Sequence, residues 1–238
     1  MNNMELKIAA VAALLEYIEA DHAPATLASS LGAEDMVLTD LIARHAPGIS
    51  VFSLDTGRLN PETYALLETV QVTYSDRIKL RVFYPQTDAL QNYVESKGIN
   101  AFYNSVELRK ACCAIRKVEP LQRALTGQKA WITGMRRQQA VTRKEMPFEE
   151  YDADHGLMKF NPLADWTEQE IWRYIRDNKV PFNALHNQHY PSIGCAPCTR
   201  PIAAGEDIRA GRWWWEDESG KECGLHVKAS PLKFEATK

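Results

Sequence analysis

Five cysteines stand in this chain of 238 residues, and four of them form two pairs. Cys112 and Cys113 are adjacent within a run of basic side chains, and Cys195 and Cys198 form a C-x-x-C pair after a glycine. Adjacent cysteines are poor disulfide partners because a bond between them distorts the intervening peptide. The pairs therefore favour metal ligation, by an iron–sulfur cluster or a structural zinc; unconnected buried cysteines are the remaining alternative.

The fifth cysteine, Cys223, stands alone near the end of the sequence. A lone cysteine is most often a small buried hydrophobe. Here the polar and flexible neighbours Lys221, Glu222, Gly224 and His226 predict an exposed thiol. The carboxylate of Glu222 opposes thiolate formation, whereas Lys221 and His226 favour it.

The elements that must position these thiols can be predicted from hydrophobic periodicity and from turn residues. A strand running into Ser30 to Gly32, with a helix directly after it, forms an anion site because the first N–H groups of the helix have no partner. The patterns predict helices over 5–20, 33–43, 61–74, 88–97, 105–125 and 167–177, and strands over 25–28, 49–54, 78–83 and 130–133.

Strands that alternate with helices indicate an α/β fold with a mainly parallel sheet flanked by helices. Ligands bind such sheets at the carboxyl ends of the strands, which places residues 30–32, 55–57 and 134–143 on one rim. We expect one main domain over residues 1–205 and a polar, glycine-punctuated C-terminal segment over 206–238.

Composition and charge exclude several classes of protein. The net charge of -3 argues against a general nucleic-acid binder. No apolar run approaches the roughly 20 residues needed to span a bilayer, and residues 1–5 lack the features of a signal peptide. We therefore expect a cytoplasmic protein without a membrane partner, in which paired cysteines hold metal or do redox chemistry. Oligomeric state is left open, with a homo-oligomer as one alternative.

Taken together, five motifs resemble the sulfonucleotide reductases, and within them the iron–sulfur branch of assimilatory adenylyl-sulfate (APS) reductases. They run in order from residue 30 to residue 226. The motifs are Ser30 to Asp35, Leu54 to Gly57, Gly134 to Gln138, the two cysteine pairs, and Glu222 to His226. The resemblance implies an adenine nucleotide hydrolase-like fold, related to the PP-loop enzymes. It also implies a nucleotide- and cluster-binding domain over residues 1–205 and a flexible C-terminal catalytic tail over 206–238.

The resemblance also implies a cofactor and a two-step reaction in sulfate assimilation. Cys112, Cys113, Cys195 and Cys198 would hold a [4Fe-4S] cluster. The thiolate of Cys223 would attack the sulfur of APS, expel AMP and leave an S-sulfocysteine. A thiol of thioredoxin or glutaredoxin, a separate protein, would then release sulfite.

Substrate-binding residues follow from the same resemblance. Arginine suits dispersed negative charge through its planar donor fork. Without the resemblance, a single arginine is most often a solvated surface residue and Asp55 with Gly57 is a plain turn. The expected set is Lys117, Arg209 and Arg212 facing the phosphosulfate, Arg136, Arg137 and Arg143 in an arginine-rich loop, Ser30 and Gly32 in the phosphate loop, and Asp55 and Gly57 near the ribose or adenine.

The sequence leaves three alternative functions open. One is a reductase of the 3'-phosphorylated nucleotide PAPS, or of both nucleotides. Another is a PP-loop sulfur-transfer enzyme acting on tRNA, although Ser-Leu-Gly-Ala-Glu-Asp departs from the Ser-Gly-Gly-x-Asp-Ser pattern of the ATP-cleaving relatives. The third is a non-catalytic iron–sulfur nucleotide sensor. The tryptophans at 166, 172 and 213–215 are expected to serve packing rather than base stacking.

Overall fold

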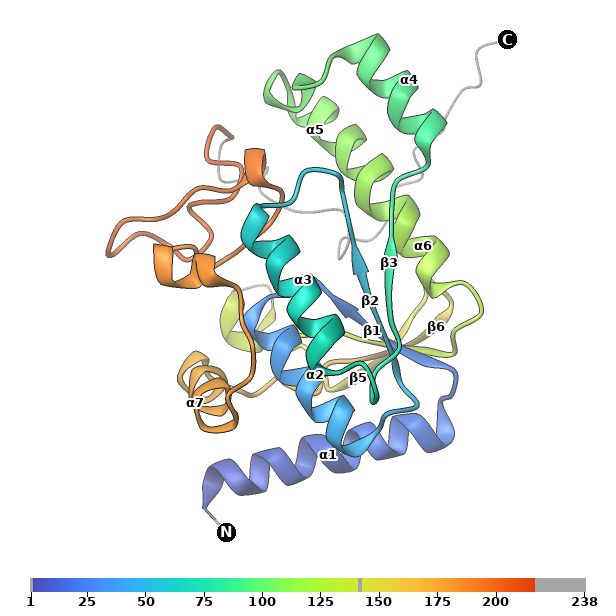
Figure 1. The fold of residues 1–238 in the computed structure, drawn as a ribbon, viewed down its shortest axis with the longest axis vertical. Helices are drawn as coiled ribbons and strands as arrows, with labels where there is room; N and C mark the ends of the chain where they lie inside the picture. Colours follow the sequence, from blue (N-terminus) through green and yellow to red (C-terminus); the bar gives the residue numbers. More distant parts are fainter. Residues whose placement is uncertain (1, 141–142, 217–238) are drawn as a thin grey trace.

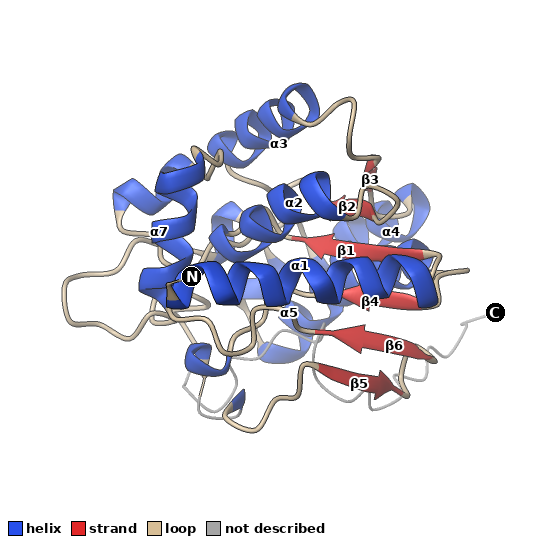
Figure 2. Cartoon of the chain, turned by 90° about the horizontal axis from the view of Figure 1, so that it is seen from below, coloured by secondary structure: helices blue, strands red, loops and turns tan. Residues whose placement is uncertain are grey.

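The computed structural model describes residues 2–140 and 143–216 of the protein. Six strands form one sheet in the order β3-β2-β1-β4-β6-β5, visible from top to bottom in Figure 2. All neighbouring strands pair in parallel except β5 and β6, so the predicted mainly parallel sheet is confirmed. The strands are β1 (Ala25–Ser29), β2 (Ser50–Leu54), β3 (Leu80–Phe83), β4 (Ala130–Ile132), β5 (Glu149–Asp152) and β6 (Leu157–Phe160).

Local signals in the sequence account for where the helices begin. Pro61 opens its helix at a position where no backbone N–H is needed. Thr167 and Glu170 form a reciprocal capping box, with N–H···O distances of 2.7 and 3.2 Å. The helices are α1 (Asn3–Asp21), α2 (Ala33–His45), α3 (Pro61–Thr73), α4 (Thr87–Lys97), α5 (Val106–Cys113), α6 (Glu119–Leu125) and α7 (Glu168–Asn178).

The helix predicted over 105–125 is not one regular α-helix. A π-helical turn, Ala114–Val118, separates α5 from α6. Pro120 has no N–H to donate to the carbonyl of Arg116, so a regular α-helical bond is impossible there. The wider turn lies directly after the first cysteine pair, and π-helical turns are frequent at functional sites.

The hairpin of β5 and β6 is the part of the sheet that the hydrophobic pattern does not predict. β5 is an edge strand whose residues alternate between exposed and partly buried, and Lys159 pairs with Glu150 across the hairpin at 3.0 Å. Edge strands often carry charged residues, because only one of their sides is paired. A short charged strand of this kind gives no apolar signal in the sequence.

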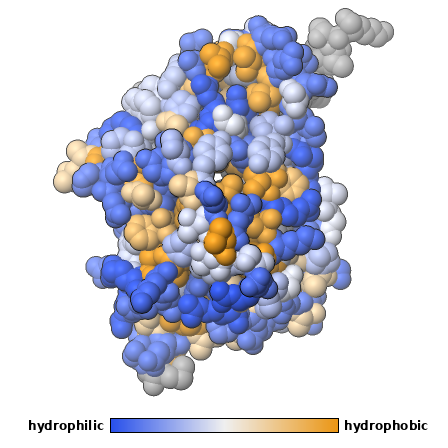
Figure 3. All heavy atoms as spheres, in the orientation of Figure 1, coloured by the Kyte–Doolittle hydropathy of each residue, from blue (hydrophilic) through white to orange (hydrophobic). Residues whose placement is uncertain are grey.

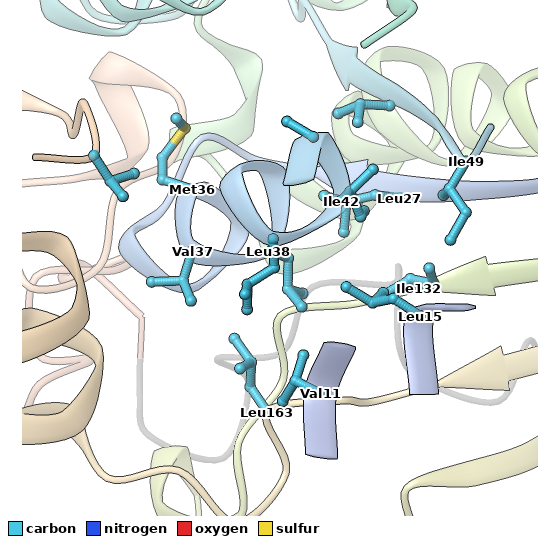
Figure 4. Packing of buried hydrophobic residues seen from close by; sticks show 14 of the residues in the cluster. Val11, Leu15, Leu27, Met36, Val37, Leu38, Ile42, Ile49, Ile132 and Leu163 are labelled. Carbon is cyan, nitrogen blue, oxygen red and sulfur yellow. The ribbon is translucent and has the colours of Figure 1, made fainter. Parts of the chain in front are cut away.

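Two apolar clusters cover the two faces of the sheet. On one face α1, α2, α3 and α7 pack against inward side chains such as Leu27 and Ile132, seen from close by in Figure 4. On the other face α6 packs on Phe52 and Trp131. Figure 1 shows α1 across the bottom of the view, with α4 and α5 at the opposite end. Drawn as spheres in the orientation of Figure 1, this side of the molecule is mostly hydrophilic, with small scattered apolar patches (Figure 3).

The order of the strands decides where a ligand can bind. From β1 the chain builds outward to β2 and β3 on one side, and then returns to β4 on the other side. The loops after β1 and β4 therefore diverge and leave a crevice at the carboxyl edge of the sheet. No helix in the described part of the chain is long and apolar enough to cross a membrane.

Candidate active site

The loop between β1 and α2 is built by local hydrogen bonds. The backbone N–H and the hydroxyl of Ser30 both donate to Oδ2 of Asp35, at 2.7 Å each. Leu31 takes a positive φ of 61° and Gly32 caps α2 with extended backbone. Burial raises the pKa of Asp35 to about 6, against the lowering effect of the bonds from Ser30. The loop therefore presents a hydroxyl beside the N-terminus of a helix.

Gly134, after β4, lies directly against this helix start. A Cβ at position 134 would lie 2.3 Å from Oδ1 of Asp35 and 3.0 Å from Cβ of Glu34. Any larger residue would force the two loops apart. The glycine thus lets the β4 loop close one wall of the crevice.

A cavity of about 260 Å³ fills the crevice between β1, β2 and β4. Apolar walls come from Phe52 and Trp131, which suit the faces of a planar ring. Ser30, Thr56 and Thr133 line it with hydroxyl groups. Its polar lining also includes Glu34, Asp35, Gln139, Lys117 and Arg143. We call this the nucleotide cavity, since it combines apolar walls, cations and a helix N-terminus.

The four paired cysteines line a second cavity, here called the cysteine cavity. Two come from α5 and two from the loop around the 3₁₀ turn Ala196–Cys198, so the fold joins segments that lie about 80 positions apart. Thr56 is 3.2 Å from the sulfur of Cys195. Burial raises the pKa of the Cys112 thiol, and raises that of Cys198 to about 12 against the lowering effect of Lys117 and Arg212.

Basic side chains surround these thiols. Arg58, Arg109, Arg116 and Lys117 all line the cysteine cavity, and Arg109 and Arg116 are buried. Arg116 donates to the carbonyl of Thr56, and its positive charge acts to lower the pKa of Cys112 against the larger raising effect of burial. Buried cations of this kind offset the negative charge that thiolates acquire on binding a metal.

The donor set fits an iron–sulfur cluster. All four candidate ligands are sulfur, the softest donor in proteins. Two buried N–H groups at this cavity, Nε of Arg116 and Nε1 of Trp213, have no hydrogen-bond partner among the described residues. Such donors suit sulfur atoms of a bound group. Within residues 2–140 and 143–216, no three His, Cys, Asp or Glu side chains are grouped so as to hold a single metal ion.

Lys117 and Cys195 belong to the lining of both cavities. Lys117 lies in the π-helical turn, four positions after Cys113, and Cys195 is hydrogen-bonded through Thr56 to the loop after β2. One cation and one thiol therefore stand in the wall between the nucleotide cavity and the cysteine cavity. This shared wall is the central feature of the candidate active site.

The residues predicted for the phosphate loop, and those predicted near the ribose or adenine, occupy different positions relative to the nucleotide cavity. Ser30 lines it, and Gly32 caps the helix whose N-terminus faces it. Asp55 accepts from the N–H of Gly57 at 2.7 Å and from the hydroxyl of Tyr64 at 2.8 Å, and is outside the lining. Gly57 has a φ of +68°. In this structure Asp55 and Gly57 therefore form a turn, and their contact with a ribose or adenine stays a prediction.

The three arginines of the loop after β4 also occupy different positions relative to the nucleotide cavity. Arg143 lines the nucleotide cavity and donates to Gln139 at 2.7 Å. Arg136 is buried and paired with Glu34 at 2.8 Å, while Arg137 donates to the carbonyl of Met146 at 2.8 Å and lies outside the lining. The structure thus brings one of the three to the cavity wall.

Near the end of the described chain, Arg212 lies close to the nucleotide cavity without lining it. Its guanidinium packs on Gly194, where a Cβ would be only 2.7 Å away, and donates to the carbonyl of Ile193 at 3.3 Å. Arg209 lies outside the lining of both cavities. Cys223 lies outside the described residues, as does most of the predicted tail. The roles of these residues stay predictions.

Several residues of the site were missed by sequence reasoning. Arg109 and Arg116 belong to the same basic run as Lys117, and that run was the available signal. Glu34 accepts from Gln139 at 3.1 Å and from Arg136, which ties the arginine loop to α2. No local pattern marks such contacts, because their partners are about 100 positions apart.

Comparisons with known proteins identify the family to which the chain belongs. The family model described as the phosphoadenosine phosphosulfate reductase domain matches residues 24–201. The adenosine 5'-phosphosulfate reductase of Allochromatium vinosum is 59% identical over 199 residues, covering 84% of this chain and 77% of its own. The chain belongs to the sulfonucleotide reductase family, among the adenosine 5'-phosphosulfate reductases. Membership makes it an oxidoreductase that acts on sulfur.

Solved structures agree with the assignment. The phosphoadenylyl-sulfate reductase of Candida auris, in a phosphate complex, superimposes with a TM-score of 0.70 at 27% identity, covering 80% of this chain and 90% of that one. The FMN adenylyltransferase of Candida glabrata gives 0.58 at 13% identity, covering 97% of this chain and 78% of that one, and shows the fold alone. The predicted adenine nucleotide hydrolase-like fold class is thereby confirmed for this sulfonucleotide reductase.

Proposed function

We propose that this protein reduces adenosine 5'-phosphosulfate to sulfite and AMP in sulfate assimilation, with a thioredoxin-type protein as reductant. The observation that carries the proposal is the wall of Lys117 and Cys195 between the nucleotide cavity and the cysteine cavity. High identity to proteins named adenosine 5'-phosphosulfate reductase supports the choice of substrate.

Cys223 is the proposed nucleophile. Its thiolate attacks the sulfur of the phosphosulfate, an S–S bond forms, and the S–O bond to phosphate breaks so that AMP leaves with the electron pair. Thioredoxin supplies two thiols. One attacks Sγ of Cys223 and expels sulfite, and the second closes the reductant's disulfide.

The residues at the carboxyl edge of the sheet have separate tasks in this proposal. The adenine lies between the apolar walls, while Ser30 and the start of α2 hold the phosphate of the nucleotide. Lys117 and Arg143 hold the oxygens around the bond that breaks and stabilise the charge that develops on AMP. Arg209, Arg212, Arg136 and Arg137 stay proposed contributors to anion binding on resemblance alone.

The second cavity is proposed to hold a [4Fe-4S] cluster on Cys112, Cys113, Cys195 and Cys198. Four thiols suit a cluster, whose usual protein ligands are cysteine thiolates, whereas structural zinc is typically held by two separated C-x-x-C pairs and here one pair is an adjacent Cys-Cys. When bound, the cluster supplies a fixed charge centre and a structural link between α5 and the cysteine loop. Thiol chemistry supplies both electrons of the reaction.

An anaerobic assay tests these proposals together. Purified protein is given APS or PAPS with thioredoxin while sulfite and the visible absorption are recorded. We expect sulfite from APS, cluster absorption, and protein-bound sulfonate by mass spectrometry when thioredoxin is left out. Cys223→Ser should keep absorption and AMP binding and form no adduct; an adduct on the serine variant would contradict the assignment.

The second candidate function is reduction of PAPS. It is favoured by the matching family model and by the likeness to the Candida auris enzyme, both named for that nucleotide. Competition between the two nucleotides in the same assay decides between them. A kcat/KM that is higher for PAPS than for APS would replace the first proposal with the second.

A further inference from the structure

Both hydrogen-bond donors of Ser30 point at one carboxylate oxygen. The backbone N–H and the hydroxyl each donate to Oδ2 of Asp35 at 2.7 Å. A serine hydroxyl carries a single hydrogen, so in this arrangement Ser30 can only accept from a group in the nucleotide cavity. Ser30 is exposed and lines that cavity. The oxygens of a phosphosulfate also only accept, so the hydroxyl as it stands has no hydrogen to give them.

Asp35 is the group that holds this hydrogen. Its side chain is 7% exposed and lies in the first turn of α2. Burial raises its pKa to about 6 and the charge of Glu34 adds to the rise, against the bonds from Ser30 and from the backbone of Gly134. Asp35 is therefore a buried carboxyl that can gain a proton near neutral pH, in direct contact with a residue of the cavity wall.

Charged and titratable groups from other elements surround the same helix start. Glu34 is held as an ion pair by Arg136, from the loop after β4, at 2.8 Å. Burial lowers the pKa of His186, which follows α7, against the raising effect of Glu34, so that ring is neutral at pH 7. The cavity wall adds two cations, Lys117 and Arg143. An anion that reaches the start of α2 thus meets cations, one paired carboxylate and the carboxylate of Asp35.

We propose that Asp35 takes up one proton when the phosphosulfate binds, and that this proton reverses the hydrogen bond between Asp35 and Ser30. The carboxyl then donates from Oδ2 to the hydroxyl oxygen of Ser30, and the hydroxyl hydrogen turns to an oxygen of the substrate. The proton comes from solvent, and no covalent bond between heavy atoms changes. The inference rests on the proposed function, which puts the phosphate of the nucleotide at Ser30. Asp35 is a positioning residue, since it acts through Ser30.

Calorimetric titration with APS counts the protons that are taken up. The Cys223→Ser protein is used so that the substrate is not consumed, and APS itself has no group that titrates near pH 7. Two buffers of different ionisation enthalpy are compared. We expect an uptake of about 0.9 proton at pH 7, because a carboxyl with a pKa of about 6 is then about one-tenth protonated in the free protein. The affinity for APS should fall about tenfold from pH 7 to pH 8.

Two serine variants in the same background separate the hydrogen-bond reversal from simple charge repulsion. Ser30→Ala removes the hydroxyl that the proton redirects, so most of the uptake and of the pH dependence should disappear. Ser53→Ala is the matched control, because Ser53 is a buried serine that lines the same cavity and donates to no carboxylate of the described residues. It should keep the uptake of the parent protein.

Three results would overturn the proposal. APS that binds without proton uptake rules out protonation of Asp35. An undiminished uptake in Ser30→Ala shows that the charge of the anion alone protonates the carboxyl, without reversal of the bond. An uptake that remains in Asp35→Asn assigns the proton to another group, and the serine pair still decides if that variant does not fold. Failure of the proposed function is distinct, because the parent protein would then bind no APS at all.

Discussion

The two neighbouring cavities differ in how their cationic side chains are held. In the cysteine cavity Arg109 and Arg116 are buried and already engaged with the protein, through Glu216 and through the carbonyl of Thr56. The nucleotide cavity is larger, and Lys117 and Arg143 stand in its wall together with hydroxyl groups and two carboxylates. Thiolates that stay bound to a metal carry a permanent negative charge, which cations buried in the fold can balance. An anionic substrate must enter and leave, so the cations that bind it have to lie at an accessible wall.

The shared wall makes this contrast testable. Lys117 and Cys195 line both cavities, whereas Cys112 lines only the cysteine cavity and Arg143 lines only the nucleotide cavity. Mutations more than about 7–10 Å apart with no shared partner usually act independently. The first two of the following experiments ask whether one cavity responds without the other, and the last two examine the nucleotide cavity alone.

The largest effect is expected for Cys112→Ser, which removes a proposed ligand that lines the cysteine cavity alone. Loss of a ligand should exceed the about 10–100-fold penalty seen for outer-shell changes, so the visible absorption and the reductase activity should both disappear. AMP affinity, measured by calorimetry, should stay within about twofold. Loss of AMP binding together with the cluster would show that the two cavities do not act separately.

The second-largest effect on reductase activity is expected for Lys117→Ala. Removing a cation that stabilises developing charge lowers kcat by about 100–1,000-fold, and the visible absorption should persist because no ligand is lost. Lys117→Arg, which keeps the charge, should recover part of the rate. Single-turnover adduct formation measures both variants, and a wild-type rate for the alanine variant would remove Lys117 from the mechanism.

Arg143→Ala and Arg137→Ala form a third comparison within one loop. Arg143 lines the nucleotide cavity, and a lost bond to a charged group is worth about 1.5–3 kcal/mol, so kcat/KM should fall about 10–100-fold. Arg137 packs over the ring of Phe148 at 4.9 Å, outside the lining. Its loss should lower kcat/KM less than the loss of Arg143 does, because Arg137 does not reach the cavity wall. Equal losses for the two variants would contradict the separation of their roles.

The smallest effect concerns Asp35, whose pKa burial raises to about 6. Between pH 3.8, the ordinary pKa of an aspartate, and pH 6, the folded state holds the proton of Asp35 more tightly than the unfolded state does. The contribution of Asp35 to the free energy of unfolding should therefore be greatest below pH 4 and fall as the pH rises from 4 to 6, by at most about 1.4 kcal/mol per pH unit. In Asp35→Asn the free energy of unfolding, measured with denaturant between pH 4 and 6, should lack this dependence on pH. A dependence equal to that of the wild type would show that another group causes it.

Local order was predictable from short patterns. The strand, turn and helix around Ser30, the first-turn proline at Pro61 and the capping box at Thr167 each depend on neighbours within a few positions. The hairpin of β5 and β6 was not predicted, since an edge strand with little apolar surface gives no periodic signal. The π-helical turn was missed for a similar reason, because an apolar period of about 3.6 residues runs through it.

By itself, the sequence determined the fold class, the two cysteine pairs and the basic run around Lys117, because these depend on residue type and local spacing. Only the tertiary structure decided which basic residue meets which anion. Arg143 lines the nucleotide cavity, Arg136 is paired with Glu34, and Arg109 holds Glu216. Such choices depend on burial and on partners about 100 positions away, where the desolvation of each charge must be balanced by contacts that only the completed fold provides.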